Sequence, residues 1–228
     1  MSRLARPAGF LACAAVLALS CLDAGAQTTA PSRLAVSLGP QWVGAADAGA
    51  RDAVLTANGA AAPLTLFRTE SALSGGIGLA GSLSARATRS LWLELGVAYH
   101  PATLTTTVFA DAEGGDLVEA EAGVQQYRIE GGVLWMLPVH QAGRRLRFFV
   151  AGAGGYVRQL YGNGLLAETG RSLSGGGGLL VWLPRRAGPS KAAGLRLDGR
   201  LLAMGGGASP GDRAALAPVA SAQFFLGF

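Results

Sequence analysis

The chain has 228 residues, of which 50% are hydrophobic and 14% are charged, and its formal net charge is +5. Soluble domains carry roughly 25% charged residues, so much of this surface is expected to face an apolar medium. The single lysine and the scattered arginines do not form the basic footprint of a nucleic-acid-binding protein. The length suits one domain.

Residues 1–26 have the three parts of a secretory signal peptide. Arg3 and Arg6 precede an apolar run, and the small residues Ala24 and Ala26 mark the expected cleavage site. Export from the cytoplasm is therefore predicted.

Cleavage would leave residues 27–228 as one domain. It would also remove both cysteines, Cys13 and Cys21, so no disulfide or thiol chemistry is expected in the mature protein. No stretch of eighteen consecutive apolar residues follows the signal peptide, so no transmembrane helix is predicted.

Apolar and polar residues alternate in eight segments of roughly ten residues or more, the length at which a tilted strand crosses a bilayer. In one of them, Leu91, Leu93 and Leu95 share a face opposite Trp92 and Glu94. The segments lie near 33–43, 72–84, 90–109, 120–137, 146–160, 171–184, 194–205 and 216–228. The pattern predicts an all-β fold, an eight-stranded antiparallel up-and-down transmembrane β-barrel.

The connectors between these segments alternate in length and charge. Three are short, basic and free of acids, and four are on average longer and carry most of the acids. The short ones are 85–89, 138–145 and 185–193, and the long ones are 44–71, 110–119, 161–170 and 206–215. Outer-membrane barrels have short periplasmic turns and longer outer loops, so both termini are expected in the periplasm.

Two of the long connectors are candidate interaction surfaces. Segment 44–71 is the longest and is rich in alanine, and it is expected to be a loop that meets a surface partner. Segment 111–121 is acidic; it is expected to be a solvated loop, with divalent-cation bridging to lipopolysaccharide phosphates and recognition of a basic partner as the open alternatives.

In several of these segments, charged residues occupy the face opposite the apolar one, as Arg196, Asp198 and Arg200 do opposite Leu195, Leu197 and Leu201. Eight strands enclose a space that side chains can fill, and a charge left alone there costs several kcal/mol. We therefore predict an interior ion network that closes the lumen. Its members are Glu94, Arg128, Glu130, Arg147, Arg196, Asp198 and Arg200.

Two segments carry a family resemblance. Residues 148–156 combine glycines with aromatic residues, and the last strand places one set of apolar side chains on one face. That set is Ala222, Phe224, Leu226 and Phe228. With its alternating strands, the chain resembles the small outer-membrane β-barrel family of Gram-negative bacteria, which includes the transmembrane domain of outer membrane protein A, over residues 33–228.

The resemblance implies location in the cell outer membrane. It also implies that the terminal apolar pattern is the signal that the barrel assembly machinery reads. Outer membrane protein A continues into a domain that binds peptidoglycan, whereas this chain stops at Phe228, so attachment to the cell wall is not implied.

The expected role is structural or surface-interacting, as a monomer in contact with outer-membrane lipid and lipopolysaccharide. We expect no catalytic, cofactor or metal site. Two alternatives remain open, a lipid A-modifying enzyme and a narrow channel. Catalysis would depend on His100 or His140, and His100 lies about 20 Å along its strand from Glu94, too far for a dyad. The spacing Gly76–Gly81 matches a dinucleotide fingerprint but lacks the helix that should follow it.

Overall fold

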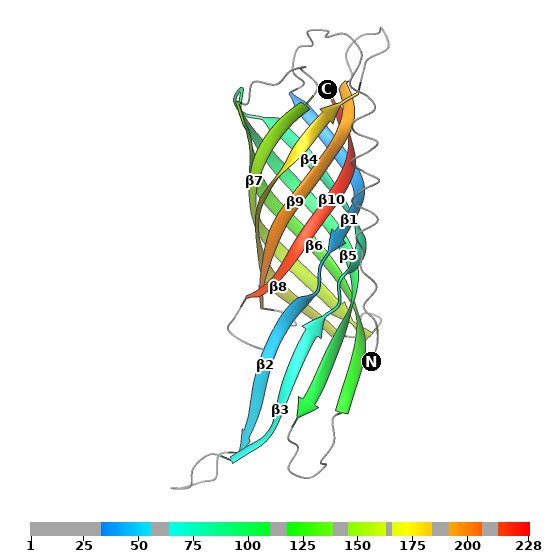
Figure 1. Ribbon diagram of the computed structural model, residues 1–228, viewed down its shortest axis with the longest axis vertical. Helices are drawn as coiled ribbons and strands as arrows, with labels where there is room; N and C mark the ends of the chain where they lie inside the picture. The colour runs from blue at the N-terminus through cyan, green and yellow to red at the C-terminus, as the bar shows by residue number, and fades with distance from the viewer. Residues whose placement is uncertain are drawn as a thin grey trace.

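The computed structural model describes residues 33–55, 64–109, 118–138, 146–162, 166–183, 192–206 and 214–228. These residues form one antiparallel sheet of ten strands without any helix (Figure 1). The strands are β1 (Leu34–Val43), β2 (Ala46–Leu55), β3 (Leu64–Leu73), β4 (Gly76–Arg86), β5 (Leu91–Phe109), β6 (Val118–Met136), β7 (Leu146–Tyr161), β8 (Leu166–Trp182), β9 (Ala192–Gly206) and β10 (Ala215–Gly227). In this part of the chain no helix is long and apolar enough to cross a membrane.

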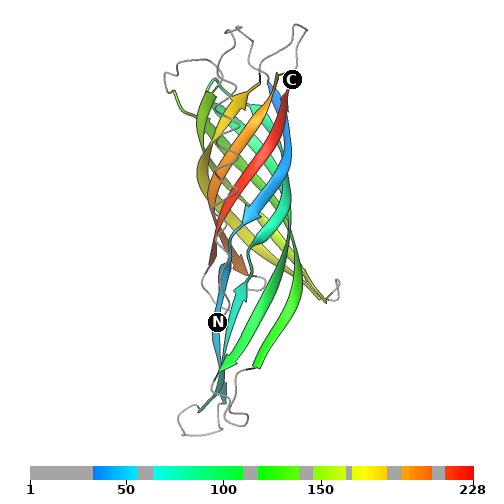
Figure 2. The ribbon, with the colours of Figure 1, turned by 45° about the vertical axis from the view of Figure 1, so that its right-hand side comes forward.

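Eight of the strands pair into a closed ring. Around the ring, β1 is followed by β4, β5, β6, β7, β8, β9 and β10, and β10 pairs back with β1. Figure 2 shows these strands tilted around a common long axis. The ring accounts for every predicted strand segment, and it brings the first and last strands together.

The expectation of a loop over 44–71 is wrong, because most of that segment forms the hairpin of β2 and β3. Residues 72–84 are likewise divided between β3, which ends at Leu73, and β4, which begins at Gly76. The β2 sequence is rich in alanine, aspartate and glycine, residues with low strand propensity. Because of this composition, the alternating pattern did not reveal β2. Its backbone pairing with β3 places it in the sheet.

The hairpin belongs to a four-stranded sheet that projects beyond the ring. Strand β3 pairs with the end of β5, from Leu73 opposite Leu104 to Arg68 opposite Phe109. Strands β5 and β6 stay paired as far as Val108 and Val118. We call this sheet the extension; it comprises β2, β3 and the adjoining ends of β5 and β6, at the bottom of Figure 1.

The opposite end of the ring is the one at which β10 finishes, and we call it the C-terminal end. Side chains alternate between the inside and the outside of the ring, as the sequence pattern predicted. Leu93 and Leu95 are exposed outside, whereas Trp92 is buried inside. The alternation also holds at the closing contact between β1 and β10. In β1, Val36 is exposed and Ser37 is buried.

Two apolar clusters occupy the interior. The cluster near the extension contains Val43, Ala46, Leu73, Val124, Leu202, Met204, Ala215, Ala217 and Val219. The cluster near the C-terminal end contains Trp92, Leu134, Met136, Phe149, Leu180 and Phe225. Gly178 makes room for the second cluster, since a Cβ atom there would lie 2.6 Å from the Phe149 ring. A polar layer lies between the two clusters.

Candidate functional site

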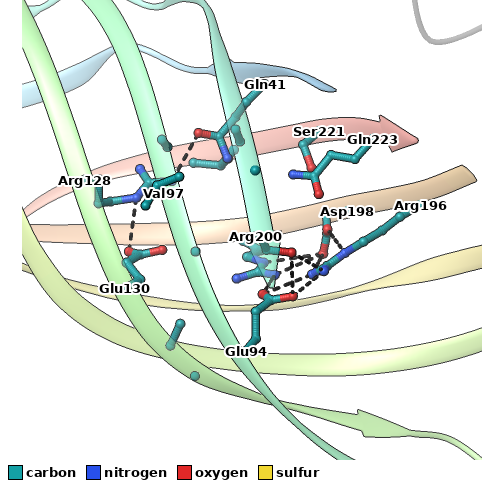
Figure 3. A pocket seen from close by; sticks show the side chains of 18 residues that line it. Gln41, Glu94, Val97, Arg128, Glu130, Arg196, Asp198, Arg200, Ser221 and Gln223 are labelled. Atoms are coloured by element: carbon teal, nitrogen blue, oxygen red, sulfur yellow. Dashed lines mark hydrogen bonds and ion pairs between the residues drawn. The ribbon is translucent and has the colours of Figure 1, made fainter. Parts of the chain in front are cut away.

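The cavity of the polar layer is lined by inward-facing polar side chains of six strands, and Ser172 of β8 joins their network. Strands β5, β6 and β9 supply its charged residues, and β1, β4 and β10 supply serine and glutamine side chains (Figure 3). These positions alternate with outward apolar residues in each strand, so the strand period of two places all of them inside.

Four charges form the centre of this layer. Arg196 binds Glu94 through its guanidinium and donates from Nε to Asp198 Oδ2 at 2.6 Å. Arg200 Nη2 lies 3.0 Å from Glu94 Oε1 and 3.4 Å from Asp198 Oδ1. The four side chains are between 4% and 14% exposed. Each arginine contacts both carboxylates, so two positive and two negative charges balance.

A second ion pair lies beside the four-charge cluster. Arg128 Nε is 3.2 Å from Glu130 Oε1, and Arg128 Nη2 donates to Gln41 Oε1 at 3.1 Å. Ser172 Oγ also donates to Glu130 Oε1, at 2.9 Å. This pair is neutral as well, so the whole polar layer carries no net charge.

Short polar side chains complete the network. Ser82 and Ser84 each donate to Glu94 Oε2 at 3.3 Å, and Ser37 donates to Gln223 Oε1 at 2.6 Å. We did not assign these residues to the network from the sequence. Their alternation with outward leucines was the available signal, since an uncharged polar residue at an inward position needs a partner there.

The structure brings together six of the seven residues assigned to the ion network. The exception is Arg147, whose side chain is exposed and makes no ion pair with the described residues. It lies opposite Leu180 of β8, at the level of the apolar cluster near the C-terminal end. That cluster separates Arg147 from the acids of the polar layer.

The polar layer encloses a cavity of about 40 Å³, enough for a few waters. Glu94, Glu130 and Asp198 are its acids, and each contacts an arginine. His100 is buried inside the ring, where it lies opposite Gln126 of β6. Among the described residues, no group of three or more histidine, cysteine, aspartate or glutamate side chains could hold a metal ion.

The four residues assigned to the assembly signal lie together on the outside of β10. Ala222, Phe224, Leu226 and Phe228 are all exposed. The Phe228 backbone accepts from the Arg33 amide at 2.8 Å and donates to the Leu34 carbonyl at 2.8 Å. The last residue is thereby joined to the start of β1.

No family model and no curated protein matches the chain. The geometry of the ring and of its interior is therefore the basis for assigning a function. Ala24, Ala26, His140 and most of the acidic segment 111–121 lie outside the described residues.

Proposed function

We propose that the chain is an outer-membrane β-barrel protein of a Gram-negative bacterium, with a closed lumen and a structural or surface-interacting role. The outer face of the ring supports this proposal. Large apolar side chains from all eight ring strands are exposed there, among them Leu38, Ile77 and Leu173, each at least 65% exposed. An apolar surface of this extent is unfavourable in water.

This apolar outer face forms an uninterrupted band. No outward residue is charged in 34–42, 77–85, 91–99, 127–135, 148–156, 173–181, 193–205 and 216–228. Nine residues of a tilted strand cover about 25 Å, the height of the apolar band of bacterial outer-membrane barrels.

Aromatic residues border the apolar band. Toward the extension, the rings of Tyr99 and Tyr127 contact each other in a tilted arrangement, with centroids 5.1 Å apart. Arg158, the outward residue that follows Tyr156 in β7, lies opposite Tyr127 in the strand register. Toward the C-terminal end, Trp135 and Phe148 are exposed. Aromatic girdles at both interfaces are typical of barrels that cross a membrane.

Charge supports one orientation of the ring. Arg33 and Arg89 are exposed at the C-terminal end, where the described residues include no acid. In the extension, exposed acids outnumber exposed arginines: the acids include Asp47, Asp52, Glu70 and Glu121, and the arginines are Arg51 and Arg68 among the described residues. In this orientation the short basic turns lie in the periplasm and the extension lies outside the cell. The start of β1 and the end of β10 then both lie on the periplasmic side.

The extension supports the surface-interacting role. Strand β2 pairs only with β3, and residues 118–123 of β6 pair only with β5, within the described part of the chain. Each edge therefore presents backbone N–H and C=O groups, which suit an extended segment of a partner protein. Lipid and lipopolysaccharide would surround the ring itself, between the extension and the periplasm.

The interior favours this role over the two alternatives. Two apolar clusters and a neutral ion network fill the space that a channel would need. His100 points into the ring, away from the lipid that a lipid A-modifying enzyme would cleave. For biogenesis we propose export by the signal peptide 1–26 and recognition of the apolar β10 residues by the barrel assembly machinery.

A pair of arginine substitutions tests membrane insertion. Leu95 and Val54 are similarly exposed, at 54% and 47%, but Leu95 lies in the apolar band and Val54 in the extension. Leu95→Arg should cost about 2–4 kcal/mol in a bilayer, whereas Val54→Arg should change stability by about 0.5 kcal/mol or less. Urea unfolding in lipid vesicles measures both. Equal effects would show that the band does not face lipid.

The closed lumen has a separate test. Wild-type protein in planar bilayers should give no steady single-channel current, because side chains occupy the interior at three levels. A steady conductance would contradict the filled interior and would favour the channel. Lipid A mass spectra that differ between cells with and without the protein would favour the enzyme.

A further inference from the structure

A second, smaller cavity lies inside the ring near the C-terminal end. Its volume is about 30 Å³. Trp92 of β5, Arg147 of β7, Trp182 of β8 and Phe225 of β10 contribute to its wall, with Arg196 of β9 on the side of the polar layer. The cavity therefore lies between the ion network and the end of the ring. We call it the indole cavity.

Two hydrogen-bond donors at this cavity have no acceptor. The indole nitrogens of Trp92 and Trp182 are both buried, and neither has a hydrogen-bond partner among the described residues. Trp92 as a whole is only 5% exposed. An indole N–H can only donate, and a buried donor without a partner is unfavourable and calls for a bound water or ion.

The charges around the indole cavity are of one sign. Arg147 and Arg196 line it, and no aspartate or glutamate among the residues that the structure describes does. Arg196 already contacts Glu94 and Asp198, whereas Arg147 makes no ion pair with any described residue. The cavity thus has two unused indole donors and one available positive charge, and Arg147 is exposed, so the site is open to solvent on its side.

We propose that the indole cavity binds a small inorganic anion of the size of chloride. The two indole N–H groups would donate to the anion, and Arg147 would supply the opposite charge. A cavity of about 30 Å³ has room for about two waters, which suits a monatomic anion and is too small for an organic acid. The site goes beyond the proposed function and does not require that the ring spans a membrane.

The indole N–H signals of the protein provide the direct test. The chain has four tryptophans, and two of them, Trp42 and Trp135, are exposed on the outside of the ring, where they serve as internal controls. Protein labelled with ¹⁵N in detergent micelles is titrated with bromide, with gluconate keeping the ionic strength constant. The signals of Trp92 and Trp182 should shift in a saturable way, and the signals of Trp42 and Trp135 should not.

Variants identify the groups that hold the anion. Trp182→Phe keeps an aromatic ring beside Phe225 and removes one donor, so half-saturation should need about ten-fold more bromide. Arg147→Gln should raise the bromide concentration at half-saturation by about five-fold, because an exposed charge contributes modestly to binding. Arg89→Gln is the control, since Arg89 is exposed at the same end but does not line the cavity; it should leave the titration unchanged.

Crystals soaked in bromide should show an anomalous peak within hydrogen-bond distance of both indole nitrogens. The proposal is overturned if Trp92 and Trp182 show no saturable shift, if all four signals shift alike, or if ordered water without anomalous signal occupies the cavity. Saturable binding by a protein that fails to enter vesicles would refute the membrane role and leave the anion site standing.

Discussion

Replacement of Arg196 by methionine would unbalance the four-charge cluster inside the ring. Methionine keeps much of the apolar stem of arginine and removes the guanidinium. Glu94 and Asp198 would then share Arg200 as their only arginine, at 3.0 Å and 3.4 Å. The cluster would change from neutral to a net charge of −1, with side chains that are at most 14% exposed.

The expected loss of stability follows from this burial. Removing one partner of a buried ion pair costs about 3–5 kcal/mol, because the other partner is left as an uncompensated charge. Glu94→Gln should have a similar cost, since it leaves Arg196 and Arg200 with one acid, Asp198. The double variant Glu94→Gln/Arg196→Met retains the neutral pair of Asp198 and Arg200. It should therefore be more stable than the sum of the single effects implies, by about 2 kcal/mol.

Urea unfolding in lipid vesicles, followed by tryptophan fluorescence, measures the four stabilities of this cycle. Arg68→Met is the control, because the Arg68–Glu70 pair is 3.4 Å apart but more than half exposed and should contribute about 1 kcal/mol or less. If Arg196→Met costs no more than Arg68→Met, the cluster is not a buried network. Strict additivity in the cycle would show that Glu94 and Arg196 do not interact.

Three further substitutions test other parts of the ring. Arg200→Ala leaves both acids on Arg196 alone and should lower the urea midpoint and alter heat-modified gel mobility; unchanged values of both would count against the network. Gly178→Ala should cost about 1–3 kcal/mol, because its Cβ would overlap the Leu197 carbonyl oxygen and the Phe149 ring, whereas Gly199→Ala, with open space at its Cβ, should be neutral by the same urea assay. Deletion of Phe228 removes the backbone bonds to Leu34 and should slow insertion and increase periplasmic degradation; normal surface levels would contradict this.

The strand period explains why so much of the ring could be predicted from the sequence. Successive side chains of a strand point to opposite faces, so if Leu93 and Leu95 face outward, Trp92 and Glu94 face inward. The same rule placed Arg196, Asp198 and Arg200 on one side of their strand. Local alternation therefore predicted the strands and their faces, including the outward side chains of the last strand.

The alternation does not reveal strands whose inward side chains are small, as in β2, where Ala46 and Ala48 are the buried residues. Strand β2 consists largely of small and acidic residues, and β3 supplies its hydrogen bonds. Its one apolar face is made of the small residues Ala46, Ala48 and Ala50, which signal burial weakly, so the segment was expected to be a loop. The extension, and with it the two open sheet edges, became visible only through the pairing of β3 with β5.

The all-β class, the inward charges and the outward apolar side chains can be predicted from the amino-acid sequence, because each depends only on the order of residues along one strand. The tertiary structure decided which inward residues meet. It joined β9 to β5 across the ring through Arg196 and Glu94, and it left Arg147 beyond an apolar cluster, beside two indoles that have no hydrogen-bond partner in the described part of the chain. Those distances depend on the tilt and register of eight strands together, which no single strand encodes.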